Sequence, residues 1–442
     1  MSYIVVGNSA AGLFAVEEIR RHDTQSELIV LTAEQEPSYS RCLTTYFLAG
    51  DIPVSQLYLR NTDFAQRLNL KIVYGVKVNW IDPTLQIVRS ADGREGHYSK
   101  LLLAMGSSAH KPSIPGGNLP EVFTLRTMED ALAINKVLEQ GAQKAVVIGG
   151  GLVSLKSAYA LKKRGLDVTV VVSSRQILSQ MLDLKEANLI QEYLRVNGLK
   201  FLLQTDVLSI TGESHVQGVL TSPQTELAAD MVIIGKGVRP NIEDLSEFGF
   251  NIGQGLQVDS SLATNLPNIY AAGDIAETWD FVPQRFTVNA TWPNATTQGR
   301  IAGANMCGRK EFYAGSLGLN SVDFFGLSAM SVGITKFQDI KEPENWEQEE
   351  NLKMEGDNPI YRKLIWQKNV SSLTLNLREE NNSSLTPIQD SPLYILKGFV
   401  LIGDTSQGGV LTALVKAGRP LTLAQRKLAL GRRGQLAVEI IK

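Results

Sequence analysis

A short apolar strand, a turn of small residues and a helix follow one another twice in this chain, about 140 residues apart. The first copy reads YIVVGNSAAGLFAVEEIRR, and the second reads KAVVIGGGLVSLKSAYALKKRG. In a dinucleotide-binding unit, small residues in such a turn let the backbone approach a pyrophosphate at the N-terminus of the helix. One turn of this kind can arise from close packing alone, but two in one chain are much more specific. The sequence therefore predicts two dinucleotide sites.

The first unit fits the dinucleotide pattern at four positions. Gly7, Ser9 and Gly12 occupy the three small positions, with serine in place of the usual middle glycine. The next strand, ELIVLTAE, ends in Glu34, about 20 residues beyond Gly12, where a carboxylate can accept hydrogen bonds from ribose hydroxyls. A solvated glutamate at a strand end is the alternative, and the preceding turn makes it the weaker reading.

The second unit departs from the pattern at the end of its second strand. Gly149, Gly151 and Ser154 fill the small positions, but Val172 stands where an acidic residue would accept the two ribose hydroxyls of NAD. The residues that follow, 173–175, are Ser-Ser-Arg, and hydroxyls with a guanidinium can clamp the 2′-phosphate of NADP. Three readings stay open: a preference for NADPH, an NADH site that tolerates the lost carboxylate, and a nicotinamide site that has decayed.

Composition argues against several other classes of protein. The 442 residues, 43% of them apolar, suffice for two or three domains with buried cores. Lys and Arg number 43 against 45 Asp and Glu, a net charge of −2 without a basic block, so we expect no nucleic-acid partner. No apolar run approaches the ~20 residues that span a bilayer, and no leader precedes the first strand, so we expect a cytoplasmic protein without a membrane partner. The two cysteines and four histidines lack metal-ligand spacing, so no metal site is expected.

Three further apolar strands, LLLAMGSS, DMVIIGKGVRPN and NIYAAGDIAE, end in glycine, which suits ligand binding at the carboxyl ends of a parallel sheet. With these motifs in this order, the chain resembles the FAD-dependent pyridine nucleotide-disulfide oxidoreductases from Ser2 to about Gly333. The resemblance implies an α/β fold with two Rossmann-like domains and a small α+β C-terminal domain. The FAD domain is discontinuous and the NAD(P) domain is inserted in it. The implied segments are 1–113 (FAD, first part), 114–240 (NAD(P)H), 241–316 (FAD, second part) and 317–442 (C-terminal, with a polar insertion near 369–393).

The resemblance also implies which residues hold FAD. The pyrophosphate would lie against the first turn, the adenosine ribose against Glu34, and the ribityl chain against Asp274. The helix that begins near Asn294 would direct its backbone amides toward the pyrimidine ring of the flavin. Met105 departs from the family motif, which has threonine there. The full implied set is Gly7, Ser9, Ala11, Gly12, Glu34, Arg41, Val78, Ala104, Gly106, Gly273, Asp274, Asn294 and Ala295.

A second implied set would hold NADH or NADPH in the inserted domain. Lys156 stands where many relatives have a glutamate near the nicotinamide, and this departure, like the Ser-Ser-Arg stretch, leaves the choice of donor open. The implied residues are Gly149, Gly151, Leu152, Val153, Ser173, Arg175 and Gly237.

Cys42, in EPSYSRCLTTYFLAG, is the candidate redox residue. Its distance from the first turn matches the single redox cysteine of CoA-disulfide reductases and of peroxide-reducing NADH enzymes. A thiolate there can be oxidised by a disulfide and reduced again through the flavin. Relatives that serve ferredoxin, rubredoxin or nitrite reductase commonly have proline at this place, so a small apolar replacement is the alternative. Cys307 has no family counterpart.

The C-terminal segment LKGFVLIGDTSQGGVLTALVKAGRP resembles that of the nitrite reductase and rubredoxin reductase type of flavin subunit. This likeness implies transfer of hydride from NAD(P)H to FAD and of electrons to an iron–sulfur or other redox protein or subunit. One alternative is a reductase of CoA-type disulfides, peroxide or oxygen that uses Cys42. Another is a flavin-bearing electron-transfer subunit whose nicotinamide site has decayed. The resemblance also allows a homodimer.

Overall fold

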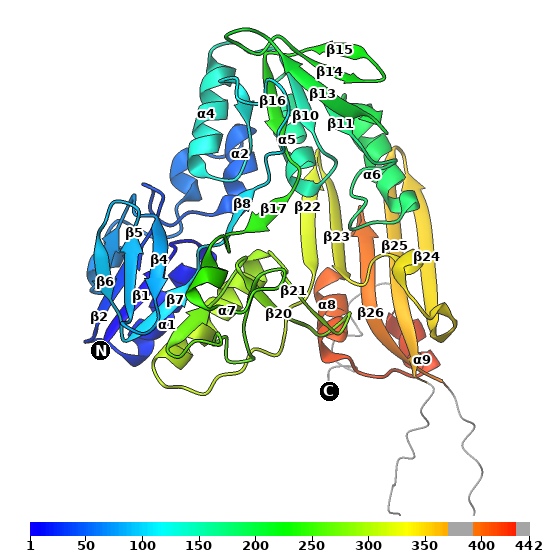
Figure 1. The fold of residues 1–442 in the computed structure, drawn as a ribbon. Coiled ribbons are helices and arrows are strands. Elements are labelled where there is room, and N and C mark those ends of the chain that lie inside the picture. The colour runs from blue at the N-terminus through cyan, green and yellow to red at the C-terminus, as the bar shows by residue number, and fades with distance from the viewer. Residues whose placement is uncertain (370–391, 430–442) are drawn as a thin grey trace, which may run out of the picture. The chain divides into compact units, whose positions relative to one another are not determined.

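A computed structural model of the chain describes residues 1–369 and 392–429 (Figure 1). Two units are separated by their internal contacts: the first comprises Met1–Gln180 and Leu194–Ser316, and the second comprises Met181–Tyr193 and the chain from Leu317 onwards. The polar insertion that we predict near 369–393 falls almost entirely outside the described residues. Within the described ranges, no helix is long and apolar enough to cross a membrane.

The first sheet of unit one has five parallel strands built from distant parts of the chain. β1 pairs with β2 on one side and with β7 on the other, and β19 adds to the edge beside β7. The Val, Ile and Leu side chains of β1, β7 and β19 are buried, and those of β2 and β3 are buried or half-buried, as in parallel sheets that are covered on both faces. The predicted discontinuous domain is thereby confirmed. In spatial order the strands are β19 (Ile269–Ala271), β7 (Lys100–Leu103), β1 (Ser2–Val6), β2 (Glu27–Leu31) and β3 (Lys71–Val73).

Two helices of this domain, α1 (Ala10–His22) and α7 (Trp292–Met306), pack closely because two glycines of α7 lie at the contact. A Cβ atom on Gly299 would lie 2.2 Å from the carbonyl oxygen of Ala11, and one on Gly303 would lie 2.6 Å from that of Ala15. Both distances are far below van der Waals contact. The packing therefore brings the late segment of the chain against the helix that follows the first glycine turn.

The second sheet of unit one is also parallel and holds the second glycine turn. β10 pairs with β11 and with β16, and α5 (Leu152–Lys163) connects β10 to β11. Helix α4 (Met128–Glu139) precedes β10. The predicted second Rossmann-like domain is confirmed by this βαβ unit. Its strands, in spatial order, are β12 (Lys200–Leu203), β11 (Asp167–Val172), β10 (Lys144–Ile148), β16 (Met231–Ile234) and β9 (Val122–Phe123).

Shorter elements complete unit one. β8 (Ser107–Ala109) and β17 (Val238–Pro240) pair antiparallel where the chain passes from the first parallel sheet to the second and back. Three small sheets have three strands each. The first contains β4 (Val78–Asp82), β5 (Ile87–Ser90) and β6 (Glu95–His97), and the second contains β13 (Asp206–Thr211), β14 (Gly218–Ser222) and β15 (Thr225–Ala228). The third contains β18 (Leu256–Gln257), β20 (Ala276–Asp280) and β21 (Arg285–Thr287). Short helices are α2 (Thr44–Leu48), α3 (Phe64–Arg67), η1 (Arg41–Leu43), η2 (Val54–Leu57) and η3 (Leu245–Phe248).

Unit two is built on an antiparallel sheet. In spatial order its strands are β22 (Leu319–Phe324), β23 (Leu327–Gly333), β26 (Leu393–Ile402), β25 (Asn358–Asn369) and β24 (Trp346–Glu355). Its helices are α6 (Leu184–Val196, of which the part up to Tyr193 belongs to this unit), α8 (Gly408–Ala417), α9 (Leu423–Ala429), η4 (Phe337–Asp339) and η5 (Pro343–Asn345).

A buried charged cluster joins the start of α6 to the sheet of unit two. The fully buried Nζ of Lys363 lies 2.9 Å from Oδ2 of Asp183 and also pairs with the buried carboxylate of Glu186. Tyr361 donates a hydrogen bond of 3.0 Å to Oε1 of Glu186. Removing one partner of such a pair leaves an uncompensated buried charge and typically costs about 3–5 kcal/mol. The cluster therefore accounts for the place of α6 in unit two, although α6 directly follows the second βαβ unit in sequence.

Candidate functional site

A cavity of about 830 Å³ opens at the carboxyl ends of β1, β2, β7 and β19. This is the sheet edge at which parallel α/β folds bind ligands. Gly12 and Asn294, two of the residues implied for FAD, do not line the cavity, although both lie in the helices α1 and α7 that border it. The other predicted residues do line it: Gly7, Ser9, Ala11, Glu34, Arg41, Val78, Ala104, Gly106, Gly273, Asp274, Ala295 and the candidate redox residue Cys42.

The first glycine turn leaves no room for side chains between β1 and α1. Gly7 has φ +115°, and a Cβ atom there would lie 2.1 Å from the carbonyl oxygen of Ala104. A Cβ atom on Gly12 would lie 1.9 Å from the carbonyl oxygen of Gly7. Ser9 is the N-cap of α1, and its side chain forms no capping hydrogen bond. The positive N-terminus of α1 therefore faces the cavity without an acidic residue in its first turn, as a pyrophosphate site requires.

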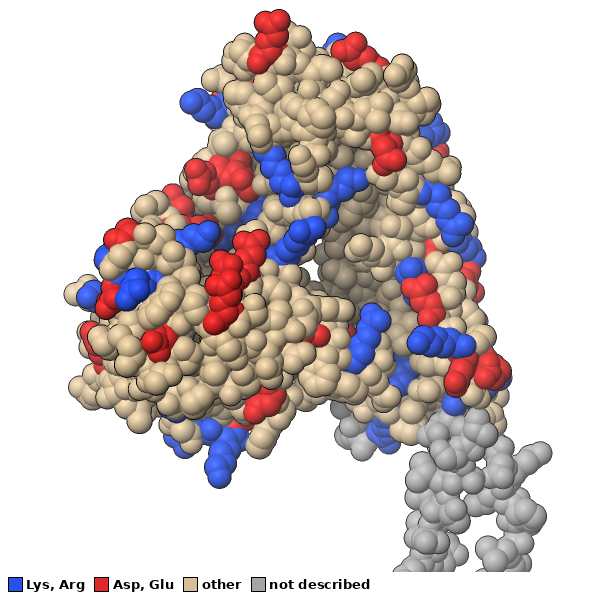
Figure 2. All heavy atoms as spheres, viewed as in Figure 1, with Lys and Arg blue, Asp and Glu red and all other residues tan. Residues whose placement is uncertain are grey.

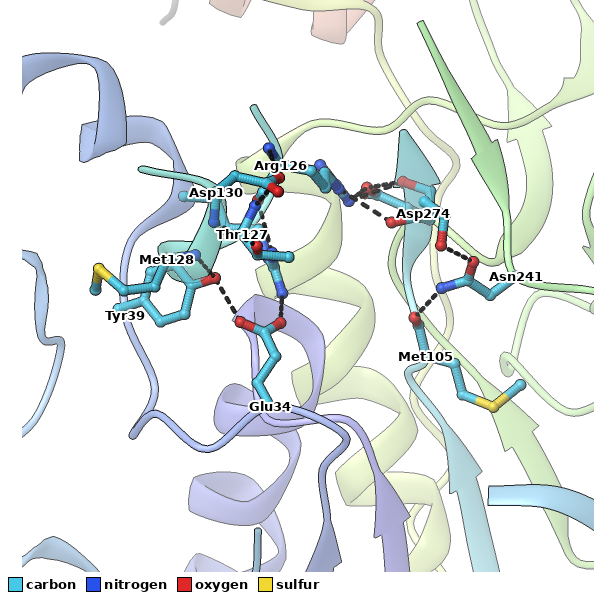
Figure 3. Close-up of polar contacts among 12 residues, drawn as sticks. Glu34, Tyr39, Met105, Arg126, Thr127, Met128, Asp130, Asn241 and Asp274 are labelled. Carbon is cyan, nitrogen blue, oxygen red and sulfur yellow. Dashed lines mark hydrogen bonds and ion pairs between the residues drawn. The ribbon is translucent and has the colours of Figure 1, made fainter. Parts of the chain in front are cut away.

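Glu34, which follows β2, forms a polar network at one side of the cavity (Figure 3). Tyr39 donates a hydrogen bond of 2.6 Å to Oε2 of Glu34, and Arg41 forms an ion pair with Oε1. The Tyr39 hydroxyl also accepts a hydrogen bond of 2.8 Å from the backbone N–H of Met128. Burial is the main reason that the pKa of Tyr39 is raised. A carboxylate has about four acceptor positions, so Glu34 can still accept hydrogen bonds from a ribose.

Asp274 lies at the other side of the cavity and is paired with Arg126 (Figure 3). Nη2 of Arg126 lies 2.7 Å from Oδ2 of Asp274, and the Ser107 hydroxyl donates a hydrogen bond of 2.8 Å to the same oxygen. Our sequence reasoning did not select Arg126, because it lies outside both glycine turns. The pair places one cation and one anion at the wall of the cavity, which suits a cofactor with both phosphate and hydroxyl groups.

A capping box fixes the position of Arg126. The Asp130 carboxylate accepts hydrogen bonds from the backbone N–H groups of Arg126, at 2.7 Å, and Thr127, at 3.1 Å. In return, the backbone N–H of Asp130 donates to the Thr127 hydroxyl at the N-cap of α4. The sequence R-T-M-E-D thus starts α4 and orients the arginine at once.

Asn241, which directly follows β17, holds the turn after β7 through hydrogen bonds. Asn241 donates through its side-chain Nδ2 to the carbonyl oxygen of Met105, at 2.7 Å, and through its backbone N–H to that of Gly106, at 3.0 Å (Figure 3). Oδ1 of Asn241 accepts a hydrogen bond of 2.7 Å from the Ser108 hydroxyl. Met105 takes part through its backbone, which explains why the turn tolerates methionine where the family motif has threonine.

Two buried polar atoms of cavity-lining residues lack partners within the described part of the chain. They are Nδ2 of Asn8, in the first glycine turn, and the hydroxyl of Thr291, the N-cap of α7. A buried polar group without a partner costs about 1–3 kcal/mol. A ligand rich in oxygen and nitrogen atoms would remove this cost. Together with the glycine turn and the two charged pairs, these atoms show that the cavity fits FAD.

Cys42 lies in the cavity as a thiol of low acidity. It belongs to η1, directly after Arg41, and is exposed to the cavity. Desolvation by the surrounding protein raises the thiol pKa, the Asp274 carboxylate raises it further, and Arg126 partly offsets both effects. The redox role of Cys42 stays a prediction. Cys307 is half-buried and packs with its sulfur 3.8 Å from the carbonyl oxygen of Ile19.

The second glycine turn repeats the geometry of the first. Gly149 has φ +124°, and a Cβ atom there would lie 2.3 Å from the carbonyl oxygen of Gly235. Gly151 is the N-cap of α5, whose first residues are Leu152 and Val153. The predicted residues Gly149 to Val153 thus form one turn at the end of β10, which fits the pyrophosphate of a second dinucleotide.

The neighbouring strand ends bring the remaining predicted nicotinamide residues to the same edge. β11 ends at the buried Val172, followed by the exposed Ser173 and Arg175, and Gly237 follows β16 with φ +90°. Lys236 also lies here and donates a hydrogen bond of 2.9 Å to the Ser173 hydroxyl. Our sequence reasoning did not select Lys236. The assignment of these individual residues to NAD(P)H stays a prediction.

Lys156, the residue that departs from the family pattern, lies between two tyrosine rings. Its Nζ is 4.2 Å from the ring centroid of Tyr46 and 4.3 Å from that of Tyr159. Only 8% of the residue is exposed, so the cation–π contacts compensate part of its lost hydration. The contacts join α2, which follows Cys42 in the chain, to α5 of the second βαβ unit.

Within residues 1–369 and 392–429, no group of three or more His, Cys, Asp or Glu side chains is arranged to hold a metal ion.

Comparison with known proteins gives the family. The family model of pyridine nucleotide-disulphide oxidoreductases matches residues 1–299. The NADH oxidase of Methanocaldococcus jannaschii is 34% identical over 351 residues, which cover 76% of this chain and 78% of that protein. The epsilon subunit of the NADH-dependent phenylglyoxylate dehydrogenase of Aromatoleum evansii is 34% identical over 335 residues, covering 75% and 79%. Among solved structures, an NAD-dependent persulfide reductase from A. fulgidus superposes with a TM-score of 0.86 at 27% identity, covering 98% of this chain and 79% of that chain.

These matches agree with the resemblance inferred from the two glycine turns. The homologues are flavoprotein oxidoreductases that use nicotinamide nucleotides, so the cofactors are FAD and NADH or NADPH. The chain belongs to the pyridine nucleotide-disulphide oxidoreductase family and is an FAD-dependent NAD(P)H oxidoreductase.

Proposed function

We propose that this oxidoreductase passes electrons from NAD(P)H, through FAD, to an iron–sulfur or other redox partner protein or subunit. Bound FAD supplies the conversion between a two-electron donor and a one-electron acceptor. The protein's own residues bind and orient the two nucleotides: the Gly7 turn and Glu34 would hold the adenosine half of FAD, and Asp274 and Arg126 would hold its ribityl and phosphate groups. The Gly149 turn would hold the pyrophosphate of the nicotinamide donor.

The state of Cys42 is the observation that favours a protein acceptor. A disulfide reductase needs a thiolate, and thiolates of low pKa lie beside a histidine, another cation or a helix N-terminus. Here desolvation by the surrounding protein and the Asp274 carboxylate raise the pKa of the thiol, the Arg126 cation offsets this rise only in part, and the described residues that line the cavity include no histidine. Cys307, the other cysteine, packs against α1 and is not part of the cavity lining. A flavin in this cavity would therefore deliver electrons directly, without a cysteine as intermediate carrier.

The relatives support both this proposal and its main competitor. The Aromatoleum protein is named as a subunit of a larger dehydrogenase, which is consistent with delivery of electrons within an assembly. The M. jannaschii and A. fulgidus proteins are named as an oxidase and a persulfide reductase. Because Cys42 lines the cavity, reduction of a CoA-type disulfide, a peroxide or oxygen is the second candidate function.

Anaerobic stopped-flow measurements of the two half-reactions distinguish the candidates. Purified protein loaded with FAD is first reduced by NADH or NADPH while the flavin absorbance is followed. The reduced protein is then mixed with a small iron–sulfur protein, a CoA-type disulfide or oxygen. We expect the iron–sulfur protein to reoxidise the flavin much faster than the disulfide or oxygen does.

The variants Cys42→Ser and Cys307→Ser form a matched pair for the same experiment. The proposal predicts that both variants resemble the wild type in both half-reactions, because no step passes through sulfur. If Cys42→Ser alone abolishes turnover with disulfide, the disulfide-reductase function replaces the proposed one. If neither nucleotide reduces the flavin, the chain is an electron-transfer subunit whose nicotinamide site has decayed.

A further inference from the structure

Lys236 spans the second nucleotide-binding edge in a way that the sequence did not suggest. The residue follows Gly235 at the end of β16, and its Nζ donates a hydrogen bond of 2.9 Å to the hydroxyl of Ser173, which follows β11. β10 lies between these two strands in the sheet, and the turn at Gly149 continues from β10. The lysine side chain therefore reaches from one strand end, past the glycine turn, to the other.

A buried hydrogen bond fixes the position of Gly235 and therefore the backbone of the adjacent Lys236. The hydroxyl of Ser154, in the first turn of α5, donates a hydrogen bond of 2.9 Å to the carbonyl oxygen of Gly235. Ser154 is fully buried, so this contact is shielded from water. The Lys236 backbone is thus tied to the helix whose N-terminus faces the pyrophosphate position.

The charge at this edge is positive and uncompensated. Arg175, two residues after Ser173, is exposed and forms no hydrogen bond or ion pair with the residues that the structure describes. Lys236 is exposed too, and in the same described ranges no carboxylate lies within ion-pair distance of its Nζ. The strand end itself bears no acid, because Val172 is only 2% exposed and apolar. An anionic group therefore fits this edge better than a neutral one.

We propose that Lys236, with Ser173 and Arg175, forms the binding site for the 2′-phosphate of NADPH and makes NADPH the preferred donor. A phosphate has several acceptor oxygens, and two cations with a hydroxyl donate to it from different directions. The ribose of NADH has only neutral hydroxyls at this place, for which an acidic acceptor is the usual partner. This inference rests on the proposed use of the Gly149 turn for the nicotinamide nucleotide.

Isothermal titration calorimetry with two fragments tests the inference without turnover. Adenosine 2′,5′-bisphosphate contains the 2′-phosphate, and adenosine 5′-monophosphate lacks it. We expect the FAD-loaded wild type to bind the bisphosphate at least about 10-fold more tightly than the monophosphate. Lys236→Gln should bind the bisphosphate about 10-fold more weakly than the wild type does, and it should bind the monophosphate equally well. A phosphomonoester loses its second charge near pH 6, so the preference should shrink below about pH 6.

Two further variants complete the experiment. Arg175→Gln should act like Lys236→Gln, and Lys144→Gln should act like the wild type, because Lys144 is exposed at the start of β10, at the opposite edge of the same sheet. In steady-state kinetics the ratio of KM for NADPH to KM for NADH should rise about 10-fold in the first two variants only.

The inference is overturned if the wild type binds the two fragments equally, or if Lys236→Gln weakens both fragments to the same extent. Either result is compatible with reduction of the flavin by NADH, in which case the proposed function survives. Conversely, tight and selective binding of the bisphosphate with no flavin reduction by either nucleotide would sustain the phosphate site and refute the proposed electron donor.

Discussion

The two glycine turns of this chain have nearly the same backbone, but the strands beside them end differently. Gly7 and Gly149 have φ values of +115° and +124°, and a Cβ atom on either would lie within 2.3 Å of a carbonyl oxygen. After the first turn, the second strand leads to Glu34, which is already paired with Arg41 in a cavity of about 830 Å³. After the second turn, the corresponding strand ends at Val172, beside exposed cations.

The difference separates what the fold determines from what single residues determine. Both βαβ units present a helix N-terminus and a close backbone approach, which are the requirements for a pyrophosphate. Selection between nucleotides depends on the residue at the end of the second strand and on its neighbours. The first unit has an acid that can accept hydrogen bonds from ribose hydroxyls, and the second has cations and a hydroxyl that we propose bind a further phosphate.

The largest expected effect comes from replacing Gly7 or Gly149 by alanine, because each substitution should disable one nucleotide site and spare the other. Gly7→Ala should abolish FAD retention, because its Cβ would lie 2.1 Å from a carbonyl oxygen and its φ is unfavourable for alanine. Gly149→Ala should leave FAD bound but prevent reduction by NADPH. The measurements are the flavin-to-protein absorbance ratio and anaerobic reduction of each variant. Loss of FAD in Gly149→Ala, with a normal melting curve, would show that the two sites are not separate.

A smaller effect is expected from Asp274 in the first site. Asp274→Ala should weaken FAD binding by about 1.5–3 kcal/mol, or about 10- to 150-fold, because a hydroxyl of the cofactor loses a charged acceptor. Fluorescence titration of the apoprotein with FAD gives the dissociation constant. Asp92→Ala is the control, because Asp92 is exposed and, among the described residues, its carboxylate pairs with its neighbours Ser90 and Arg94. Equal constants for both variants would remove Asp274 from the FAD site.

One substitution should give the second site an acidic residue at its strand end, as the first site has. Val172→Glu should shift the preference from NADPH toward NADH by about 10-fold, because the new carboxylate accepts ribose hydroxyls and repels a 2′-phosphate. The ratio of kcat/KM for the two donors measures this shift. Since Val172 is buried, the melting temperature is recorded in parallel. An unchanged ratio in a stable variant would mean that this strand end does not contact the ribose.

The smallest effect concerns the thiol in the first cavity. The pKa of Cys42 is raised, so its thiolate forms only at higher pH than that of an ordinary cysteine, and alkylation of the apoprotein by iodoacetamide at pH 8 should be slower than that of a model thiol. Asp274→Asn removes a charge that raises this pKa and should speed alkylation a few-fold. Faster alkylation than the model thiol would indicate an activated cysteine and favour the disulfide-reductase function.

The fold and the two turns could be predicted because their signals are local. A glycine is required where φ is positive and a backbone oxygen lies about 2 Å from the Cβ position, so Gly7 and Gly149 mark their turns in the sequence itself. Arg126 could not be found in this way. Its partner Asp274 lies 148 residues further along the chain, and only the pairing of distant strands brings them together.

Lys236 was missed for the same reason. It meets Ser173 across 63 residues, and the contact depends on the order of three strands in the second sheet. The sequence around Lys236 resembles a strand end followed by glycine, which indicates ligand proximity but not the direction of a side chain. The glycine turns were therefore predictable from local sequence, whereas Arg126 and Lys236, whose side chains meet partners from distant parts of the chain, were not.

Anaerobic titration of the purified protein tests most directly whether the two turns bind FAD and a nicotinamide nucleotide in one chain. We expect one FAD per chain and complete bleaching of the flavin absorbance by one equivalent of NADPH, with NADH less effective at equal concentration. A colourless protein that cannot be reconstituted with FAD would contradict the assignment of the first site. A yellow protein that neither NADPH nor NADH can reduce would contradict the assignment of the second.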